Sequence, residues 1–122
     1  MVRERLENAG VTLTGLNIRN ITGQKADSNE RDLRYNMRQV EWDMHLSRAL
    51  NLNSANLKGG ARTDEATEDL IEGINNVLER VPDFTLNLGN HKGNCLENID
   101  DYIIILPQVL AMAKVLMDTG HL

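Results

Sequence analysis

The sequence predicts an α/β fold in which about four parallel strands alternate with crossover helices. Short apolar or alternating stretches are separated by longer segments in which apolar residues recur at helical spacing. The stretches begin about thirty to forty residues apart, which is the period of repeated βαβ units. Because a helix-length crossover joins parallel neighbours, we expect the strands to pair in parallel.

Composition limits the size and the class of the protein. The chain has 122 residues and a mass of 13.7 kDa, which allows one modest domain, residues 1–122. Hydrophobic residues make up 41% of it, and no apolar run approaches the roughly 20 residues that a membrane span needs. A net charge of −5 without a Lys/Arg cluster argues against nucleic acid as a partner and favours a small polar substrate.

The N-terminal residues predict a short helix and no secretory signal. Residues 3–8 read as the tail of a helix that is capped by Gly10, as though the chain began inside a βα unit. The charged start is unlike a signal peptide, so we expect a cytoplasmic protein. The single cysteine, Cys95, cannot form an internal disulfide, and it reads as an ordinary loop residue because no base is placed beside it.

The first long helix is predicted over residues 28–50 by apolar residues that share one face: Leu33, Met37, Val40 and Met44. Asp27 and Glu30 form a capping-box pattern at its start. At helical spacing, Trp42 is expected to pack in or near the core with the methionines, and not to form part of a cofactor site.

Two further helices are predicted from their caps. Thr63 caps the second, whose apolar stripe consists of Ala66, Leu70, Ile74, Val77 and Val81 before Pro82 ends it. The third begins at Asn98, with Asp101 completing a capping box, and runs to Leu106. The β-branched residues 103–105 also suit a strand, but the cap and the need for a crossover favour a helix.

Four stretches are predicted as strands: residues 11–18, 52–57, 84–88 and 115–117. In parallel α/β folds the loops after the carboxyl ends of the strands carry the functional groups. Asp118 follows the last of these strands, with His121 close behind it. A carboxylate and an imidazole in that proximity suit a divalent metal (Mn²⁺, Co²⁺, Zn²⁺ or Mg²⁺), although two donors three apart are common by chance.

Two other loops carry candidate binding groups. After the third predicted strand, His91 reads as a ligand, a substrate hydrogen-bond donor or a simple loop residue, and Asn90 precedes it. After the second, Gly59-Gly60 bring backbone amides near the start of a helix, where Lys58 and Arg62 could meet an anionic group. An ordinary strand-to-helix turn explains the glycine pair equally simply.

Residues 46–122 resemble the sugar phosphate isomerase/epimerase superfamily, the xylose isomerase-like TIM barrels. The matching pieces are residues 46–50 with the following Lys58-Gly59-Gly60, residues 85–91, and the run Asp118-Thr119-Gly120-His121. The resemblance implies a partial barrel whose four strands correspond to the third to the sixth of eight. Two strands on each side would be missing, since such a barrel needs roughly 250 residues.

The resemblance also implies roles for individual residues. Asp118 matches a metal ligand, and His121 matches a pocket histidine that also touches metal in some members. Where the family usually has a glutamate ligand before Asn-His, this chain has Gly89, which leaves that function to Asn90 and His91 or to nothing.

The implied activity is isomerisation or epimerisation of a sugar or related polyol, with metal polarising an oxygen while a carboxylate or histidine moves the neighbouring carbon-bound proton. In it His91 would be catalytic, Lys58, Arg62 and Asn90 would bind substrate, and Asp118 and His121 would hold the metal. The alternative is a non-catalytic or degenerate barrel that acts only through association, because open sheet edges recruit partners, including a second copy.

Overall fold

The computed structural model describes residues 2–18 and 33–121. In chain order the elements are α1 (Val2–Asn8), α2 (Leu33–Ala49), β1 (Ser54–Lys58), α3 (Asp64–Arg80), β2 (Thr85–Gly89), α4 (Ile99–Ile105), the 3-10 turn η1 (Leu106–Gln108), β3 (Ala113–Leu116) and the 3-10 turn η2 (Thr119–His121). The alternation of strand and helix from β1 onward confirms the predicted α/β fold class.

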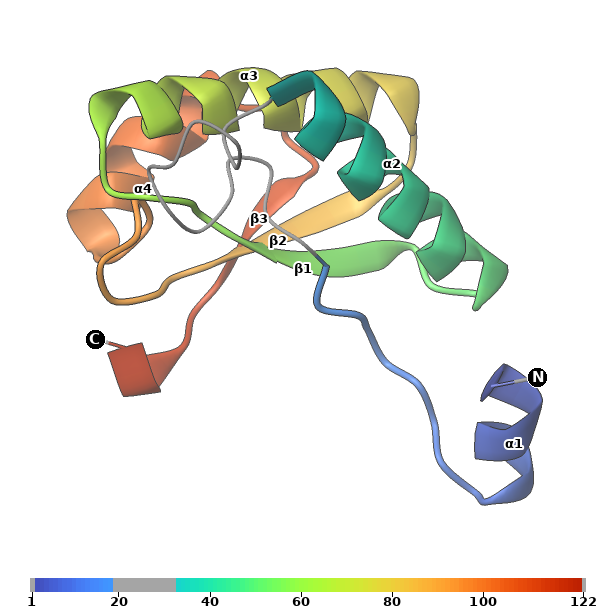
Figure 1. Ribbon diagram of the computed structural model, residues 1–122. Helices are drawn as coiled ribbons and strands as arrows, with labels where there is room; N and C mark the ends of the chain where they lie inside the picture. The colour runs from blue at the N-terminus through green and yellow to red at the C-terminus, as the bar shows by residue number, and fades with distance from the viewer. Residues whose placement is uncertain (1, 19–32, 122) are drawn as a thin grey trace.

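The sheet is parallel throughout, with strand order β1-β2-β3. The first predicted strand contributes a parallel bridge from Asn17 to Asn56 of β1, with backbone bonds from Ile18 N–H to Asn56 O and from Asn56 N–H to Leu16 O. Residues 11–18 thus contribute one isolated bridge beside β1 and not the strand that was predicted, so the sheet has three strands. α2, α3 and α4 cover one of its faces (Figure 1). α1 stands apart from these helices at the N-terminal end of the chain (Figure 1).

The predicted caps are where the sequence placed them. The hydroxyl of Thr63 accepts from Ala66 N–H at 3.1 Å at the start of α3. Asn98 and Asp101 complete a reciprocal capping box on α4. Gly10 follows α1 with φ of +72°, a left-handed conformation that glycine adopts without strain. The predicted capping pair of the first long helix, Asp27 and Glu30, lies outside the described residues.

The core fills the space between the helices and the sheet. Its largest fully buried side chains come from all these elements and from the segments between them: Phe84, Met44, Leu57, Leu70, Ile74, Leu86, Leu88, Leu96 and Ile105. Burying a side chain of this size stabilises a fold by about 1.5–3 kcal/mol. One-sided burial holds the helix layer on the sheet and leaves the other sheet face uncovered among the described residues.

One expectation about packing is wrong. Trp42 is 62% exposed, because the buried face of α2 carries Val40, Met44 and Ser47, and Trp42 points elsewhere on the helix. Cys95 lies in the loop between β2 and α4, as predicted, but it is only 4% exposed and belongs to the core cluster. The last strand also starts two residues earlier than predicted, at Ala113, which is its buried position. Among the described residues, no helix is long and apolar enough to cross a membrane.

Candidate functional site

The carboxyl ends of the three strands lie side by side. In the register of the sheet, Lys58 at the end of β1 pairs with Gly89, and Gly89 pairs with Leu116 near the end of β3. Asp118 follows two residues after β3. The structure therefore brings together the ends of the strands from which the sequence-predicted residues come, as the topology of parallel strands requires.

Gly89 leaves room on this edge. A Cβ built on Gly89 would meet Lys58 Cγ at 3.6 Å and a Leu116 side-chain carbon at 3.7 Å, which are ordinary contacts. The side chains of Lys58 and Leu116 thus flank Gly89. Sterics do not require a glycine there.

Asn90 fixes the position of Asp118. The Asn90 side chain is fully buried, and its Nδ2 donates to Asp118 O at 3.0 Å while its Oδ1 accepts from Asp118 N–H at 2.6 Å. Asp118 Oδ1 in turn accepts from Gly120 N–H at 2.9 Å, and the residue is exposed. The amide of Asn90 is therefore engaged with the backbone that carries the candidate ligand.

His91 begins the loop after β2 and is half-buried. Its backbone N–H donates to Leu96 O, and its O accepts from Asn94 N–H, so the loop is folded back on itself. Nδ1 lies 2.9 Å from Lys92 O. A carbonyl oxygen only accepts, so this contact requires the proton on Nδ1, and the neutral ring then carries its lone pair on Nε2.

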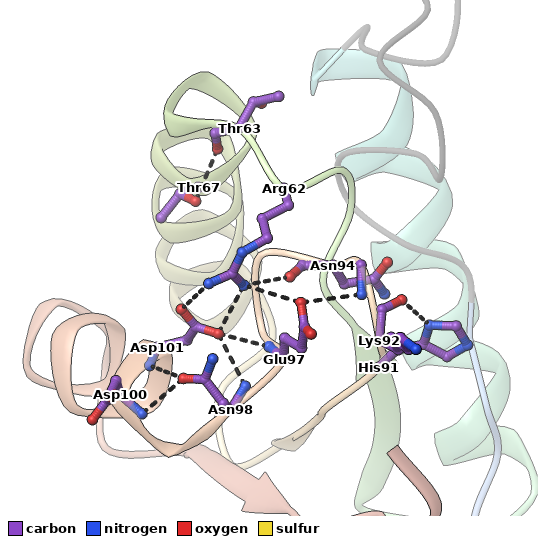
Figure 2. A network of polar contacts seen from close by, with 11 residues as sticks. Arg62, Thr63, Thr67, His91, Lys92, Asn94, Glu97, Asn98, Asp100 and Asp101 are labelled. Atoms are coloured by element: carbon purple, nitrogen blue, oxygen red, sulfur yellow. Dashed lines mark hydrogen bonds and ion pairs between the residues drawn. The ribbon is translucent and has the colours of Figure 1, made fainter. Parts of the chain in front are cut away.

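Arg62 belongs to a polar network that joins the starts of α3 and α4 (Figure 2). Its guanidinium donates to both carboxylate oxygens of Asp101, at 2.9 and 3.0 Å, and to Asn94 O at 2.9 Å. Glu97 lies 3.6 Å away. The hydrogen bond to Asp101 is the main cause that raises the pKa of Arg62. The predicted substrate-binding cation is thus already paired within the chain.

The Asp101 carboxylate accepts hydrogen bonds at the starts of both α3 and α4. Besides Arg62, its Oδ2 accepts from the backbone N–H groups of Glu97 at 2.9 Å and Asn98 at 3.0 Å. Burial acts to raise the pKa of the Asp101 carboxyl, but the hydrogen bonds from Arg62 and from these backbone donors outweigh it, so the pKa lies below its ordinary value.

The glycine pair after β1 packs against the β2–α4 loop. Gly60 O accepts from Cys95 N–H at 3.1 Å. A Cβ on Gly59 would stand 2.8 Å from Cys95 Sγ and 3.2 Å from Leu96 N, so no side chain fits at Gly59 without a shift. Burial raises the pKa of the Cys95 thiol, which disfavours the nucleophilic thiolate. Close backbone approach therefore explains Gly59, and both glycines are buried.

The uncovered sheet face carries a row of asparagines that the sequence interpretation missed. Asn87 Nδ2 donates to Asn56 Oδ1 at 3.2 Å, and Asn56 Nδ2 donates to Asn17 Oδ1 at 3.1 Å. Lys114 is the register partner of Asn87 on β3. The strict alternation of polar and apolar residues in β1 and β2 could have predicted this polar face. Strands that are buried on both faces consist of continuous apolar runs. An alternating strand therefore has one face that is exposed to solvent.

The donors needed for a metal centre are incomplete in the described part of the chain. There, no group of three His, Cys, Asp or Glu side chains lies close enough to hold an ion. Asp118 offers one carboxylate, and the side chain of His121, at the end of η2, is outside the description. A divalent ion usually needs three or more protein ligands, so Asp118 alone does not make a site.

Comparison with solved structures identifies the architecture. A solved chain described as a xylose isomerase-like TIM barrel/4-hydroxyphenylpyruvate dioxygenase fusion protein superposes with a TM-score of 0.74 over 98% of this chain, at 15% sequence identity. The fold is that of part of a TIM barrel. The chain spans 20% of the length of that solved chain. No family model and no curated protein matches the sequence.

The TIM-barrel fold indicates which face of the sheet points outward and which face lines the interior of the barrel. α2, α3 and α4 form part of its outer ring, and the asparagine row with Lys58 and Lys114 lies on the face that lines the interior. The active-site end of such a barrel is the carboxyl end of its strands, where Lys58, Gly89 and Asp118 lie. At 15% identity the likeness shows the fold and does not extend to the activity of the solved protein.

Proposed function

We propose that this chain supplies part of the active-site mouth of an isomerase or epimerase barrel that acts on a sugar or a related polyol. The main support for the proposal is the pair of hydrogen bonds between the side-chain amide of Asn90 and the backbone of Asp118, at the carboxyl ends of neighbouring strands. A fully buried amide that fixes the backbone of an exposed carboxylate is an arrangement suited to orienting a ligand or a substrate contact. Under this proposal, Asn90 positions Asp118.

The roles follow from the chemistry of each group. His91 moves the proton next to the carbonyl, because it follows the carboxyl end of β2 and imidazole is the side chain most often used as a general base. The Lys58 ammonium lies at the same end of the sheet, where it can stabilise an anionic group or the negative charge that develops on the substrate oxygen. The bidentate pair with Asp101 makes Arg62 a structural residue more than a substrate contact.

Asp118 is proposed as one ligand of a divalent metal, as the resemblance implies. A bound ion would polarise a substrate oxygen. Its further ligands would have to come from His121 and from strands outside the described residues, since the described side chains do not provide three.

Calorimetric titration with Mn²⁺ and Zn²⁺ tests the metal ligand. We expect saturable binding that Asp118→Ala abolishes and that Glu68→Ala, which removes an exposed carboxylate from α3, leaves unchanged. Equal binding by the wild type and Asp118→Ala would remove Asp118 from the metal site.

Exchange of solvent deuterium into sugar C–H bonds, followed by NMR over a panel of aldoses and ketoses, tests the proton transfer. We expect exchange that His91→Ala abolishes, because a proton abstracted by His91 can be replaced from solvent. No exchange with any sugar, or undiminished exchange in His91→Ala, would contradict the assigned role.

A second candidate is a barrel segment that works only through association. It is favoured by the incomplete donor set among the described side chains and by exposed apolar residues at both edges of the sheet. Absence of metal binding and of exchange, together with stable self-association, would select this candidate over the first.

A further inference from the structure

The helix layer carries a hollow between α2 and α3. Its volume is about 250 Å³, and six residues of the two helices line it: Arg34, Met37, Arg38 and Glu41 of α2 with Asn76 and Arg80 of α3. The two helices lie side by side over the same face of the sheet (Figure 1). No lining residue comes from the loops that carry Lys58, His91 and Asp118, so the hollow is separate from the candidate site at the strand ends.

The carboxylate of Glu41 is already paired. Its Oε2 accepts from Arg80 Nε at 2.9 Å, and His45 Nε2 lies 3.8 Å from its Oε1. Glu41 is the single acidic side chain among the residues that line the hollow. Because Arg80 balances this carboxylate, the other two cations of the hollow receive no counter-charge from it.

Arg34 and Arg38 carry the unbalanced charge. Both are exposed, and they lie four residues apart, which puts them on the same face of α2. Within the described part of the chain, neither guanidinium forms a hydrogen bond or an ion pair. Two like charges at this spacing destabilise a helix. A bound anion would relieve that repulsion, and it would do so at a local excess of positive charge in a chain whose net charge is −5.

The hollow also has an apolar wall. Met37 lies between the two arginines in sequence, lines the hollow and packs against the hydrophobic core. On the opposite side, Asn76 Nδ2 donates to Glu72 O at 2.9 Å, so the Asn76 amide is held by its own helix. The hollow therefore combines two guanidinium groups with one apolar surface, which suits a ligand that has an anionic end and a carbon-containing end.

A phosphate monoester matches this combination better than other anions. Its phosphoryl group carries close to two negative charges at neutral pH, and its three oxygens accept hydrogen bonds from the forked donors of arginine. A carboxylate carries one charge and would balance one guanidinium only. Nucleic acid is disfavoured, because the net charge of −5 repels a polyanion.

We propose that the hollow between α2 and α3 binds the phosphate group of a small phosphorylated molecule. Arg34 and Arg38 contact the phosphoryl oxygens, and Met37 contacts the carbon part. A volume of about 250 Å³ admits a phosphate group with a few attached carbon atoms. The site does not depend on the proposed function, since it stands whether or not the strand ends act on a sugar.

Calorimetric titration with inorganic phosphate, glycerol phosphate and glycerol tests the proposal. We expect both phosphates to bind with a Kd of about 1 mM or tighter, glycerol phosphate more tightly because of Met37, and glycerol not at all. Arg34→Gln and Arg38→Gln should each weaken binding about tenfold, through the loss of one charge-assisted contact. Arg5→Gln is the matched control and should bind as the wild type does, because it removes an exposed arginine from α1.

Glu41→Gln changes the affinity in the opposite direction. It removes the carboxylate that pairs with Arg80, so glycerol phosphate should bind several-fold more tightly. In NMR spectra of the wild type, the Nε–H signals of Arg34 and Arg38 should shift on adding glycerol phosphate, and that of Arg5 should not.

The outcomes separate the sources of the phosphate. Equal affinity for both phosphates would support the phosphate site and assign it to free phosphate. A phosphorylated peptide that binds these arginines more tightly than glycerol phosphate would overturn the small-molecule ligand. The site itself would be overturned by the absence of saturable phosphate binding, by full affinity in Arg34→Gln and Arg38→Gln, or by an equal loss in Arg5→Gln.

Discussion

Gly59 and Gly89 lie at the ends of neighbouring strands but are glycines for different reasons. Gly59 is packed so closely against Cys95 and Leu96 that a methyl group does not fit. Gly89 has ordinary clearance on all sides and no positive φ. The sequence shows the same residue type at both positions, and only the neighbours across the fold distinguish them.

Alanine substitution at the two glycines should therefore have opposite effects. Gly59→Ala should destabilise the fold by about 1–3 kcal/mol because the new Cβ would stand 2.8 Å from Cys95 Sγ. Gly89→Ala should be neutral or stabilising by up to about 1 kcal/mol, since it restricts the unfolded chain without a clash. Urea unfolding at fixed protein concentration measures both. Equal destabilisation by the two substitutions would contradict this account.

Tyr102 is a buried residue whose ionisation should limit stability at high pH. Its hydroxyl donates to Leu88 O at 2.8 Å, and burial raises the pKa of Tyr102 to about 12 from an ordinary value of 10.0. The folded state therefore favours the neutral phenol. This contribution is fully present below pH 10 and is lost as pH rises toward 12.

We expect the free energy of unfolding to fall by about 2–3 kcal/mol between pH 10 and 12, as follows from the difference between the two pKa values. Tyr102→Phe should remove this fall, whereas Tyr35→Phe, at the exposed tyrosine, should retain it. Denaturant unfolding across this pH range measures the effect. A fall of the same size in Tyr102→Phe would assign it to other groups.

At the scale of elements, α3 and α4 are joined at their N-terminal ends. Arg62 directly precedes the cap of α3, and Asp101 lies in the first turn of α4, so their bidentate pair fixes the two helices relative to each other. The capping box of α4 was predictable because it depends on residues three apart. The partner of Asp101 was not, since Arg62 is 39 residues away in sequence.

Asp101→Asn should destabilise the fold by about 1–3 kcal/mol, because it removes a charged acceptor from Arg62 and from two backbone donors. Since the pKa of Asp101 is lowered in the folded state, its contribution is present above its ordinary pKa of 3.8 and is lost as pH falls through the lowered value. Asp101→Asn should weaken this acid dependence, and Glu68→Gln should not. The free energy of unfolding, measured from pH 5 downward for all three proteins, tests this prediction. An unchanged acid dependence in Asp101→Asn would show that the Asp101 carboxylate is not its source.

At the scale of the molecule, the fold leaves unsatisfied edges in both layers. Exposed apolar side chains on α2, α4 and β3 flank the outermost strand positions of a sheet that has barrel curvature. The local sequence does not predict that Trp42 and Ile103 are exposed, because both occupy helices whose opposite faces are buried. Their exposure becomes visible only when the neighbours on both sides of each helix are known.

If the second candidate function holds and the chain works through self-association, stability depends on protein concentration. The thermal unfolding midpoint of the wild type should rise with total chain concentration, because dissociation accompanies unfolding. Trp42→Lys, which replaces a large exposed apolar side chain, should weaken that dependence. Calorimetric scans over a hundredfold range of concentration test this, and a constant wild-type midpoint would speak against a dimer.

The sequence by itself determined the elements and their order. Helix caps at Thr63, Asn98 and Gly10, apolar stripes, and the spacing of short strands all depend on residues within a few positions of one another, so they fixed the α/β class and parallel pairing in advance. The strand ends that carry Lys58, His91 and Asp118 followed from topology.

Only the tertiary structure decided what those residues contact. It paired Arg62 with Asp101, placed Asn90 on the backbone of Asp118, buried Cys95 against Gly59 and left Trp42 exposed. Each of these contacts, or the lack of one, depends on segments far apart in the chain. The physical reason is that hydrogen-bond patterns and periodicity act locally, whereas burial and charge pairing depend on which elements become neighbours when the barrel segment folds.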